Sequence, residues 1–314
     1  MEPAQKFKNP LYRWVYQAPF VAAGAAVFCF LLSIAFQHDQ LTVCWRSVLV
    51  ASALYLLAHC LRAMRLAVVA TSLTKLSGRF ALLLHFATAP LVMCLPFKMG
   101  ELARLGAFCL AGVRLFDVVM IVLLDRLFDA VMLGVLLVTT GTGYDSAASG
   151  EVIVQWMIMG VALAAGLCFL VAPRTLVSLQ RYILLNHSTR GTLRELWLVD
   201  LFRRGTTKGQ LLLRNQGMML LMVSAMIWIL ELAATSLFMP LASPNRFQDV
   251  TALLMAHLNW GGLAAFSSPI DPALAASAAS SLIAVLVVWP IALYGFCKTI
   301  LTGQRVMRQP AYKR

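Results

Sequence analysis

Six long apolar stretches constrain this chain more than any other feature. Each has about the 20 residues that an α-helix needs to cross the ~30 Å hydrocarbon core of a bilayer. They are Ala18–Phe36, Ser47–Met64, Val118–Val138, Val152–Ala172, Gly217–Met239 and Leu274–Phe296. Hydrophobic residues make up 61% of the chain and charged residues 12%, against roughly half and a quarter in soluble domains. The sequence therefore predicts an all-α polytopic membrane protein with six full transmembrane helices, and it excludes a water-soluble globule.

Two shorter apolar stretches, Phe80–Leu95 and Thr251–Ser268, are interrupted by proline or glycine. We interpret them as re-entrant or broken-helix segments, one entering from each face, because the flanking charges leave no room for simple crossings. In the second stretch Asn259, Gly261 and Gly262 favour an unwound loop that lines a cavity. This arrangement is typical of an inverted repeat.

One integral membrane domain, residues 1–314, is therefore predicted. Its first half is 1–138 and its second half is 216–314, with a linking helix and a basic cytoplasmic loop in 139–215.

The distribution of basic residues predicts which segments lie on the cytoplasmic side of the membrane. The net charge is +13, and eight Lys and Arg residues lie in Pro173–Asn215 alone, a stretch that we interpret as a loop. Three segments between predicted helices, Gln37–Trp45, Thr139–Glu151 and Pro240–Val250, together carry a single basic residue, Arg246. Basic loops stay on the cytoplasmic side, so both termini are expected in the cytoplasm. The positive charge indicates an anionic membrane leaflet as partner rather than nucleic acid.

The segment from Pro96 to Arg104 places charges where the apolar run is broken. Pro96 and Gly100 interrupt the run, and Glu101 and Arg104 are three residues apart on one helical face. A helix N-terminus beside Lys98 and Arg104 is a good place for a phosphate group. An interfacial loop in which Glu101 and Arg104 merely neutralise each other explains the same residues.

Charged residues also interrupt the later apolar helices. Asp125, Arg126 and Asp129 point to one side of their helix, and a buried charge costs at least ~2.5–3.5 kcal/mol at the centre of a membrane helix. They predict either a structural ion cluster or a site for an anion or a proton. Glu231 is a lone carboxylate that suits a proton carrier, although a buried hydrogen-bonded carboxylate is an equal alternative.

Arg62 and Arg65 are predicted to end the second helix. There they either snorkel to the interface or form the mouth of an anion pathway.

Motifs of enzymes and metal sites are absent from the sequence. It contains no P-loop, GxGxxG, HExxH or GxSxG motif, so no catalytic residue and no cofactor are expected. The five histidines, His38, His59, His85, His187 and His257, are not expected to cluster, and no metal site is predicted. Seven cysteines without a CxxC pair indicate neither a disulfide framework nor a zinc site.

Three of these motifs resemble the lysylphosphatidylglycerol synthase transmembrane family, also called flippase-like integral membrane proteins. They are Arg62-x-x-Arg65, Pro96-x-x-x-Gly100-Glu101-x-x-Arg104 and Asp125-Arg126-x-x-Asp129. The family's last motif usually reads Glu-Arg-x-x-Asp, so Asp125 stands in place of a glutamate. Gly261 and Gly262 match the family's late loop without its flanking proline and glutamate. Larger relatives add a cytosolic aminoacyl-transferase domain, for which we see no segment here, so synthase activity is not expected.

The resemblance implies a lipid-handling protein of the bacterial inner membrane. We expect a flippase for a phosphate-bearing lipid, such as a polyprenyl-phosphate-linked lipid, a phospholipid or an aminoacyl-phospholipid. Arg104, Arg126 and Lys98 would contact the phosphate, and Arg62 and Arg65 would guide it. The carboxylates Glu101, Asp125, Asp129 and Glu231 would balance these charges and carry a coupling proton. The alternatives are a membrane-embedded transferase using Glu101 or Asp125, and an accessory partner of a cell-envelope biosynthetic enzyme.

Overall fold

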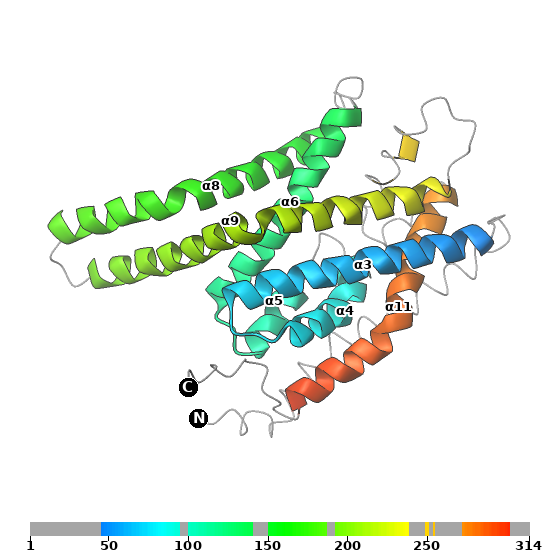
Figure 1. Ribbon diagram of the computed structural model, residues 1–314, viewed down its shortest axis with the longest axis horizontal. Helices are drawn as coiled ribbons and strands as arrows, with labels where there is room; N and C mark the ends of the chain where they lie inside the picture. The colour runs from blue at the N-terminus through cyan, green and yellow to red at the C-terminus, as the bar shows by residue number, and fades with distance from the viewer. Residues whose placement is uncertain are drawn as a thin grey trace. The chain divides into compact units, whose positions relative to one another are not determined.

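The computed structural model describes residues 45–94, 100–140, 150–186, 192–238, 249–250, 254 and 272–301. Every named element in this part of the chain is an α-helix, as the sequence predicts. The helices are α3 (Trp45–Leu73), α4 (Gly78–Cys94), α5 (Gly100–Leu110), α6 (Leu115–Thr140), α8 (Gly150–Asn186), α9 (Thr192–Ser236) and α11 (Pro272–Leu301), which Figure 1 labels. The predicted span Ala18–Phe36 and the predicted loop residues Asn259, Gly261 and Gly262 lie outside the described residues.

Three of the described helices are long and apolar enough to cross a membrane, namely Trp45–Leu73, Thr192–Ser236 and Ala276–Ile300. They contain most of the predicted spans Ser47–Met64, Gly217–Met239 and Leu274–Phe296. Helix α6 has 26 residues, with Asp125, Arg126 and Asp129 within its apolar sequence. The chain therefore has the helices of a membrane protein, and the total of six spans stays a prediction.

The described residues group into two compact units. Unit 1 takes them from Met1–His59, Leu83–Ala107 and Leu230–Cys297, and unit 2 takes them from Cys60–Leu82, Phe108–Ile229 and Lys298–Arg314. Each unit combines segments that are far apart in the sequence. The first part of α3 and the end of α9 belong to unit 1, whereas the rest of both helices belongs to unit 2.

Helix α3 is longer than the sequence predicts, so the prediction that Arg62 and Arg65 end it is wrong. The helix continues to Leu73 because the residues after Arg65 are apolar and contain neither glycine nor proline. Leu66, Val69 and Leu73 are buried on this extension. Arg65 consequently lies inside the helix, about 12 Å from its end at 1.5 Å per residue.

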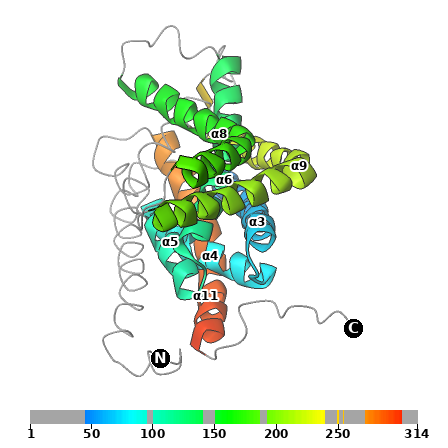
Figure 2. The ribbon, with the colours of Figure 1, turned by 90° about the vertical axis from the view of Figure 1, so that its left-hand side faces the viewer.

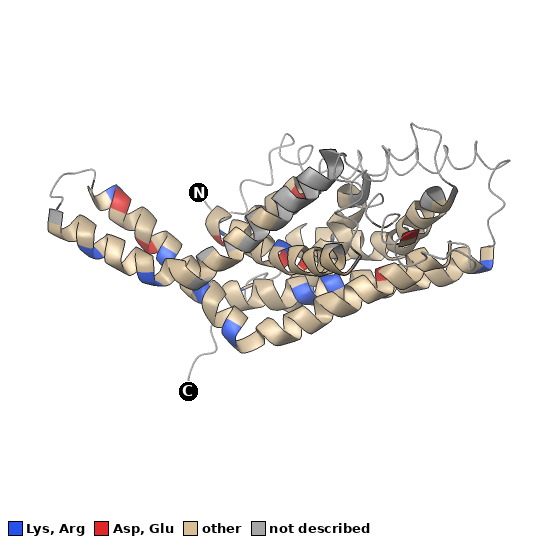
Figure 3. Ribbon diagram, turned by 90° about the horizontal axis from the view of Figure 1, so that it is seen from above, with Lys and Arg blue, Asp and Glu red and all other residues tan. Residues whose placement is uncertain are grey.

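The predicted basic loop Pro173–Asn215 is mostly helical, which corrects the sequence interpretation. Helix α8 runs through Pro173 to Asn186, and α9 begins at Thr192, so the two form a helical hairpin (Figures 1 and 2). Figure 3 shows basic residues spaced along this hairpin. The hairpin packs against α6 within unit 2, since the ring of Phe202 meets that of Phe116 with centroids 4.9 Å apart. Hydrophobic periodicity did not predict a helix in this segment because many of its residues are charged.

Helices α4 and α5 are short. With 17 and 11 residues, they extend about 26 Å and 17 Å at 1.5 Å per residue, less than a ~30 Å hydrocarbon core. Two short helices in succession are compatible with the predicted re-entrant segment Phe80–Leu95, which stays a prediction. Helix α5 is followed by Gly112, whose positive φ of 84° lets the chain reverse at little cost.

Candidate functional site

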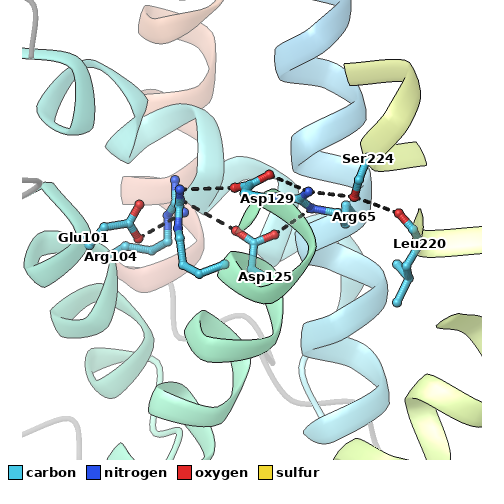
Figure 4. Close-up of polar contacts among 8 residues, drawn as sticks. Arg65, Glu101, Arg104, Asp125, Asp129, Leu220 and Ser224 are labelled. Carbon is cyan, nitrogen blue, oxygen red and sulfur yellow. Dashed lines mark hydrogen bonds and ion pairs between the residues drawn. The ribbon is translucent and has the colours of Figure 1, made fainter. Parts of the chain in front are cut away.

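Arg65 is the centre of a buried polar network in unit 2. Its side chain is 1% exposed. Nε donates a hydrogen bond to Asp125 Oδ1 at 2.9 Å, and Nη1 donates to Asp129 Oδ1 at 2.7 Å and to Ser224 Oγ at 2.8 Å. The Ser224 hydroxyl in turn donates to the carbonyl oxygen of Leu220 at 2.8 Å, as Figure 4 shows. A guanidinium can serve several acceptors at once because its N–H groups point in fixed, different directions.

The two carboxylates of this network come from α6. Asp125 and Asp129 are one turn apart, so they lie on the same helical face, and their side chains are 6% and 16% exposed. Arg126 also approaches both, with Nη1 3.2 Å from Asp129 Oδ2 and Nη2 3.8 Å from Asp125 Oδ2. We call Arg65, Asp125, Arg126, Asp129 and Ser224 the arginine–aspartate network.

Sequence analysis found four members of the arginine–aspartate network and missed Ser224. Spacing on one helix identified the α6 charges, and the arginines at the predicted end of the second helix included Arg65. Ser224 is fully buried on α9, and a single serine in an apolar helix gives no signal of its own. Its position facing Arg65 depends on how α3 and α9 pack.

Arg65 and Arg126 differ in their freedom to meet a ligand. The Arg126 side chain is 37% exposed, and its two carboxylate contacts are longer than those of Arg65. Arg65 cannot act at the mouth of a pathway unless both of its ion pairs break, so the predicted guiding role does not fit its position. Arg62, one turn earlier on α3, is half-buried and acts electrostatically on Asp129.

The arginine–aspartate network is neutral as a whole, because it holds two arginines and two aspartates. Arg62 adds a nearby cation that acts electrostatically on Asp129. A partly exposed arginine with long carboxylate contacts is a chemically suitable contact for an anion such as phosphate.

Glu101 and Arg104 form a pair in unit 1. Arg104 Nη1 lies 3.3 Å from Glu101 Oε2, three residues earlier on α5, and its side chain is 3% exposed. Helix α5 begins at Gly100 with Glu101 in its first turn, so the helix start that the sequence predicts at this point is confirmed. Lys98 lies outside the described residues.

Glu231 is buried in unit 1, with 4% of its surface exposed. One turn later on α9, the Thr235 hydroxyl donates to the Glu231 carbonyl oxygen at 2.8 Å. The hydroxyl of Tyr55 on α3 bonds to Thr235 Oγ1 at 3.1 Å and to Ser277 Oγ of α11 at 2.7 Å. A row of buried polar side chains therefore links three helices of unit 1.

Two histidines lie together in unit 1, so the prediction that the histidines do not cluster is wrong for this pair. His59 of α3 and His85 of α4 are both buried, and their ring centroids are 6.0 Å apart. The sequence separates them by 26 positions, and only the packing of α4 against α3 brings them together.

Comparisons with protein-family models, with curated proteins and with solved structures find no match for this chain.

Proposed function

We propose that this protein is a lipid translocator of the bacterial inner membrane that moves a phosphate-bearing lipid headgroup across the bilayer. The observation that carries the proposal is the arginine–aspartate network, in which Arg126 is partly exposed on an apolar helix. Charges at membrane depth are expensive and generally face a polar path or each other. The lipid tail would stay in the bilayer, so the polar path has to accommodate only the headgroup.

Arg126 is the residue that we assign to the phosphate. Its contacts with Asp129 and Asp125, at 3.2 Å and 3.8 Å, are the longest ion pairs of the network. When Arg126 turns to a phosphate, Asp125 and Asp129 keep the shorter contacts with Arg65. Arg65 thus prevents the aspartates from being left as unpaired buried charges, which would be strongly unfavourable.

The other predicted contacts belong to the same proposal. Arg104 and Lys98 are proposed to bind phosphate, and Arg62 to guide it. We propose that both termini lie in the cytoplasm, because the α8–α9 hairpin and the terminal segments are basic. The partners are then the lipid substrate, the anionic leaflet and a biosynthetic enzyme of the cell envelope that makes or consumes the lipid.

Lipid flipping by the purified chain tests the proposal. The chain is reconstituted into vesicles of phosphatidylethanolamine and phosphatidylglycerol that contain a trace of phosphatidylglycerol with a fluorescent headgroup. An impermeant quencher then reports the rate at which labelled lipid reaches the outer leaflet. We expect Arg126→Ala to lower this rate about tenfold or more, because a charge-assisted hydrogen bond contributes ~1.5–3 kcal/mol and 1.4 kcal/mol corresponds to tenfold.

Arg204→Ala is the matched control. Arg204 is an arginine of unit 2 whose side chain is 72% exposed and paired with Asp200, so its loss should leave the rate at the wild-type value. A folded Arg126→Ala variant that flips lipid as fast as wild type would overturn the assigned site. Mass spectrometry of lipids that copurify with wild type but not with Arg126→Ala would identify the lipid. An identical bulk-lipid profile in both would mark the charges as structural.

A further inference from the structure

The histidine pair of unit 1 lies in an apolar setting where ionisable groups are rare. His59 is 7% exposed and His85 is 4% exposed, and the two rings are tilted by 50° at a centroid distance of 6.0 Å. Imidazole is the side chain that gains and loses a proton near neutral pH. Two imidazoles at this distance influence each other's protonation, because like charges in a poorly solvated region disfavour each other.

Glu231 of α9 and His59 of α3 lie at the same height along these two neighbouring helices. In unit 1, Tyr55 of α3 contacts Thr235 of α9. Arg65, further along α3, contacts Ser224, which is earlier on α9, so the two helices run in opposite directions. One turn forward from Tyr55 is His59, and one turn back from Thr235 is Glu231. In an antiparallel pair these two steps lead to the same level.

The hydroxyl groups of Ser277, Tyr55 and Thr235 donate their hydrogen bonds in one order. Because Thr235 donates its only hydroxyl proton to the Glu231 carbonyl oxygen, its oxygen has to accept from Tyr55. Tyr55 has then used its proton, so it accepts from Ser277. The hydrogen bonds therefore run in the order Ser277 to Tyr55 to Thr235, and this hydroxyl chain joins α11, α3 and α9 without supplying a charge.

We propose that His59, His85 and Glu231 form a binding site for one proton in unit 1, and that binding and release of this proton drives lipid movement. The coupling rests on the proposed translocator function, whereas proton binding itself does not. In the loaded state an imidazolium faces the Glu231 carboxylate, and in the empty state both imidazoles are neutral. The carboxylate favours the loaded state and the second imidazole limits the site to one proton.

Other titratable groups belong to the elements that build unit 1. Among the described side chains they are the exposed Arg46 and the buried Tyr55 on α3, Glu101 and Arg104 on α5, and Tyr294 and Cys297 on α11. Glu101 and Arg104 compensate each other as an ion pair, and tyrosine and cysteine ordinarily titrate above neutral pH. Among these groups the two histidines and Glu231 are therefore the ones suited to exchange a proton near pH 7.

Nuclear magnetic resonance of the ¹⁵N-histidine-labelled chain in lipid nanodiscs tests the site without any transport. The His59→Gln and His85→Gln variants assign the two imidazole signals. We expect the wild-type pair to titrate in two separated steps, and His85→Gln and Glu231→Gln each to shift the titration midpoint of His59. Thr88→Val is the control, because Thr88 is buried on α4 but donates only to the carbonyls of Leu84 and His85. Independent titration of His59, unaffected by either variant, would overturn the site.

A pH gradient across the phosphatidylethanolamine–phosphatidylglycerol vesicles tests the coupling. We expect the gradient to accelerate wild-type and Thr88→Val flipping severalfold, and Glu231→Gln and His59→Gln to lose this acceleration. Flipping that ignores the gradient in wild type would overturn the coupling. If no variant flips lipid while the histidines still titrate as a pair, the translocator function is wrong and the proton site stands.

Discussion

The two units keep polar groups in their interiors in different ways. Unit 2 contains full charges, with Arg65 held between two aspartates at 2.7 Å and 2.9 Å. The described interior of unit 1 also holds an ion pair, that of Arg104 with Glu101, but it adds neutral hydroxyls, two histidines and the buried Glu231 of α9. Arginine stays charged at any physiological pH, whereas histidine and glutamate can change charge. This difference is the basis of the proposed anion site in unit 2 and of the proposed protonation site in unit 1.

The largest effect is expected from removing the centre of the unit 2 network. Arg65→Ala would leave Asp125 and Asp129 without their closest cation, and breaking a buried ion pair in this way costs ~3–5 kcal/mol. Thermal unfolding in detergent measures the loss, and Arg204→Ala should cost no more than about 1 kcal/mol as an exposed pair. Equal stability of Arg65→Ala and wild type would mean that the network does not hold unit 2 together.

A smaller effect is expected from disturbing the close packing of α9 against α6 in unit 2. A Cβ at Gly205 of α9 would overlap with the Phe116 ring of α6, and overpacking of this kind costs ~1–3 kcal/mol. Gly160→Ala on α8 is the matched substitution, since nothing lies within 4 Å of its Cβ and alanine favours a helix by ~1 kcal/mol. The free energy of unfolding should fall for Gly205→Ala and rise or stay constant for Gly160→Ala. A stabilised Gly205→Ala variant would contradict the close approach of α9 to α6.

The smallest effect is expected in unit 1. Tyr55→Phe removes the hydroxyl that joins Thr235 and Ser277, and a neutral hydrogen bond contributes ~0.5–1.5 kcal/mol. Ser280→Ala is the control, because the Ser280 hydroxyl donates only to Ala276 of its own helix. Thermal unfolding of both variants compares a bond between helices with one inside a helix. If Tyr55→Phe cost as much as Arg65→Ala, the contrast between the two units would fail.

Much of the network was predictable because its spacing is local. Residues one turn apart share a helical face, so the sequence alone placed Asp125, Arg126 and Asp129 together. The contact of Arg65 with Asp125 spans 60 positions, and no periodicity indicates it. Its position after the second apolar stretch made Arg65 a candidate, but its role as the buried centre of the network came from the structure.

Errors of the sequence interpretation have physical causes. Hydropathy ended the second helix at Met64 because Arg62 and Arg65 lie on either side of it, yet an arginine can lie inside a helix when carboxylates pair with it. The basic segment Pro173–Asn215 was interpreted as a loop because it is polar, although arginine, leucine and glutamine are good helix formers. In both regions the charges are accommodated by contacts that a window of neighbouring residues does not contain.

The sequence by itself determined the class of protein, since a surplus of apolar residues in helix-length stretches has to face lipid. It also determined which helix face carries the charges of α6, because helical periodicity is a property of adjacent turns. Only the tertiary structure decided that Arg65 and Ser224 join those charges and that His59 meets His85. Such pairings depend on which helices pack together and in what register, and this is set by side-chain complementarity across the whole fold rather than by local spacing.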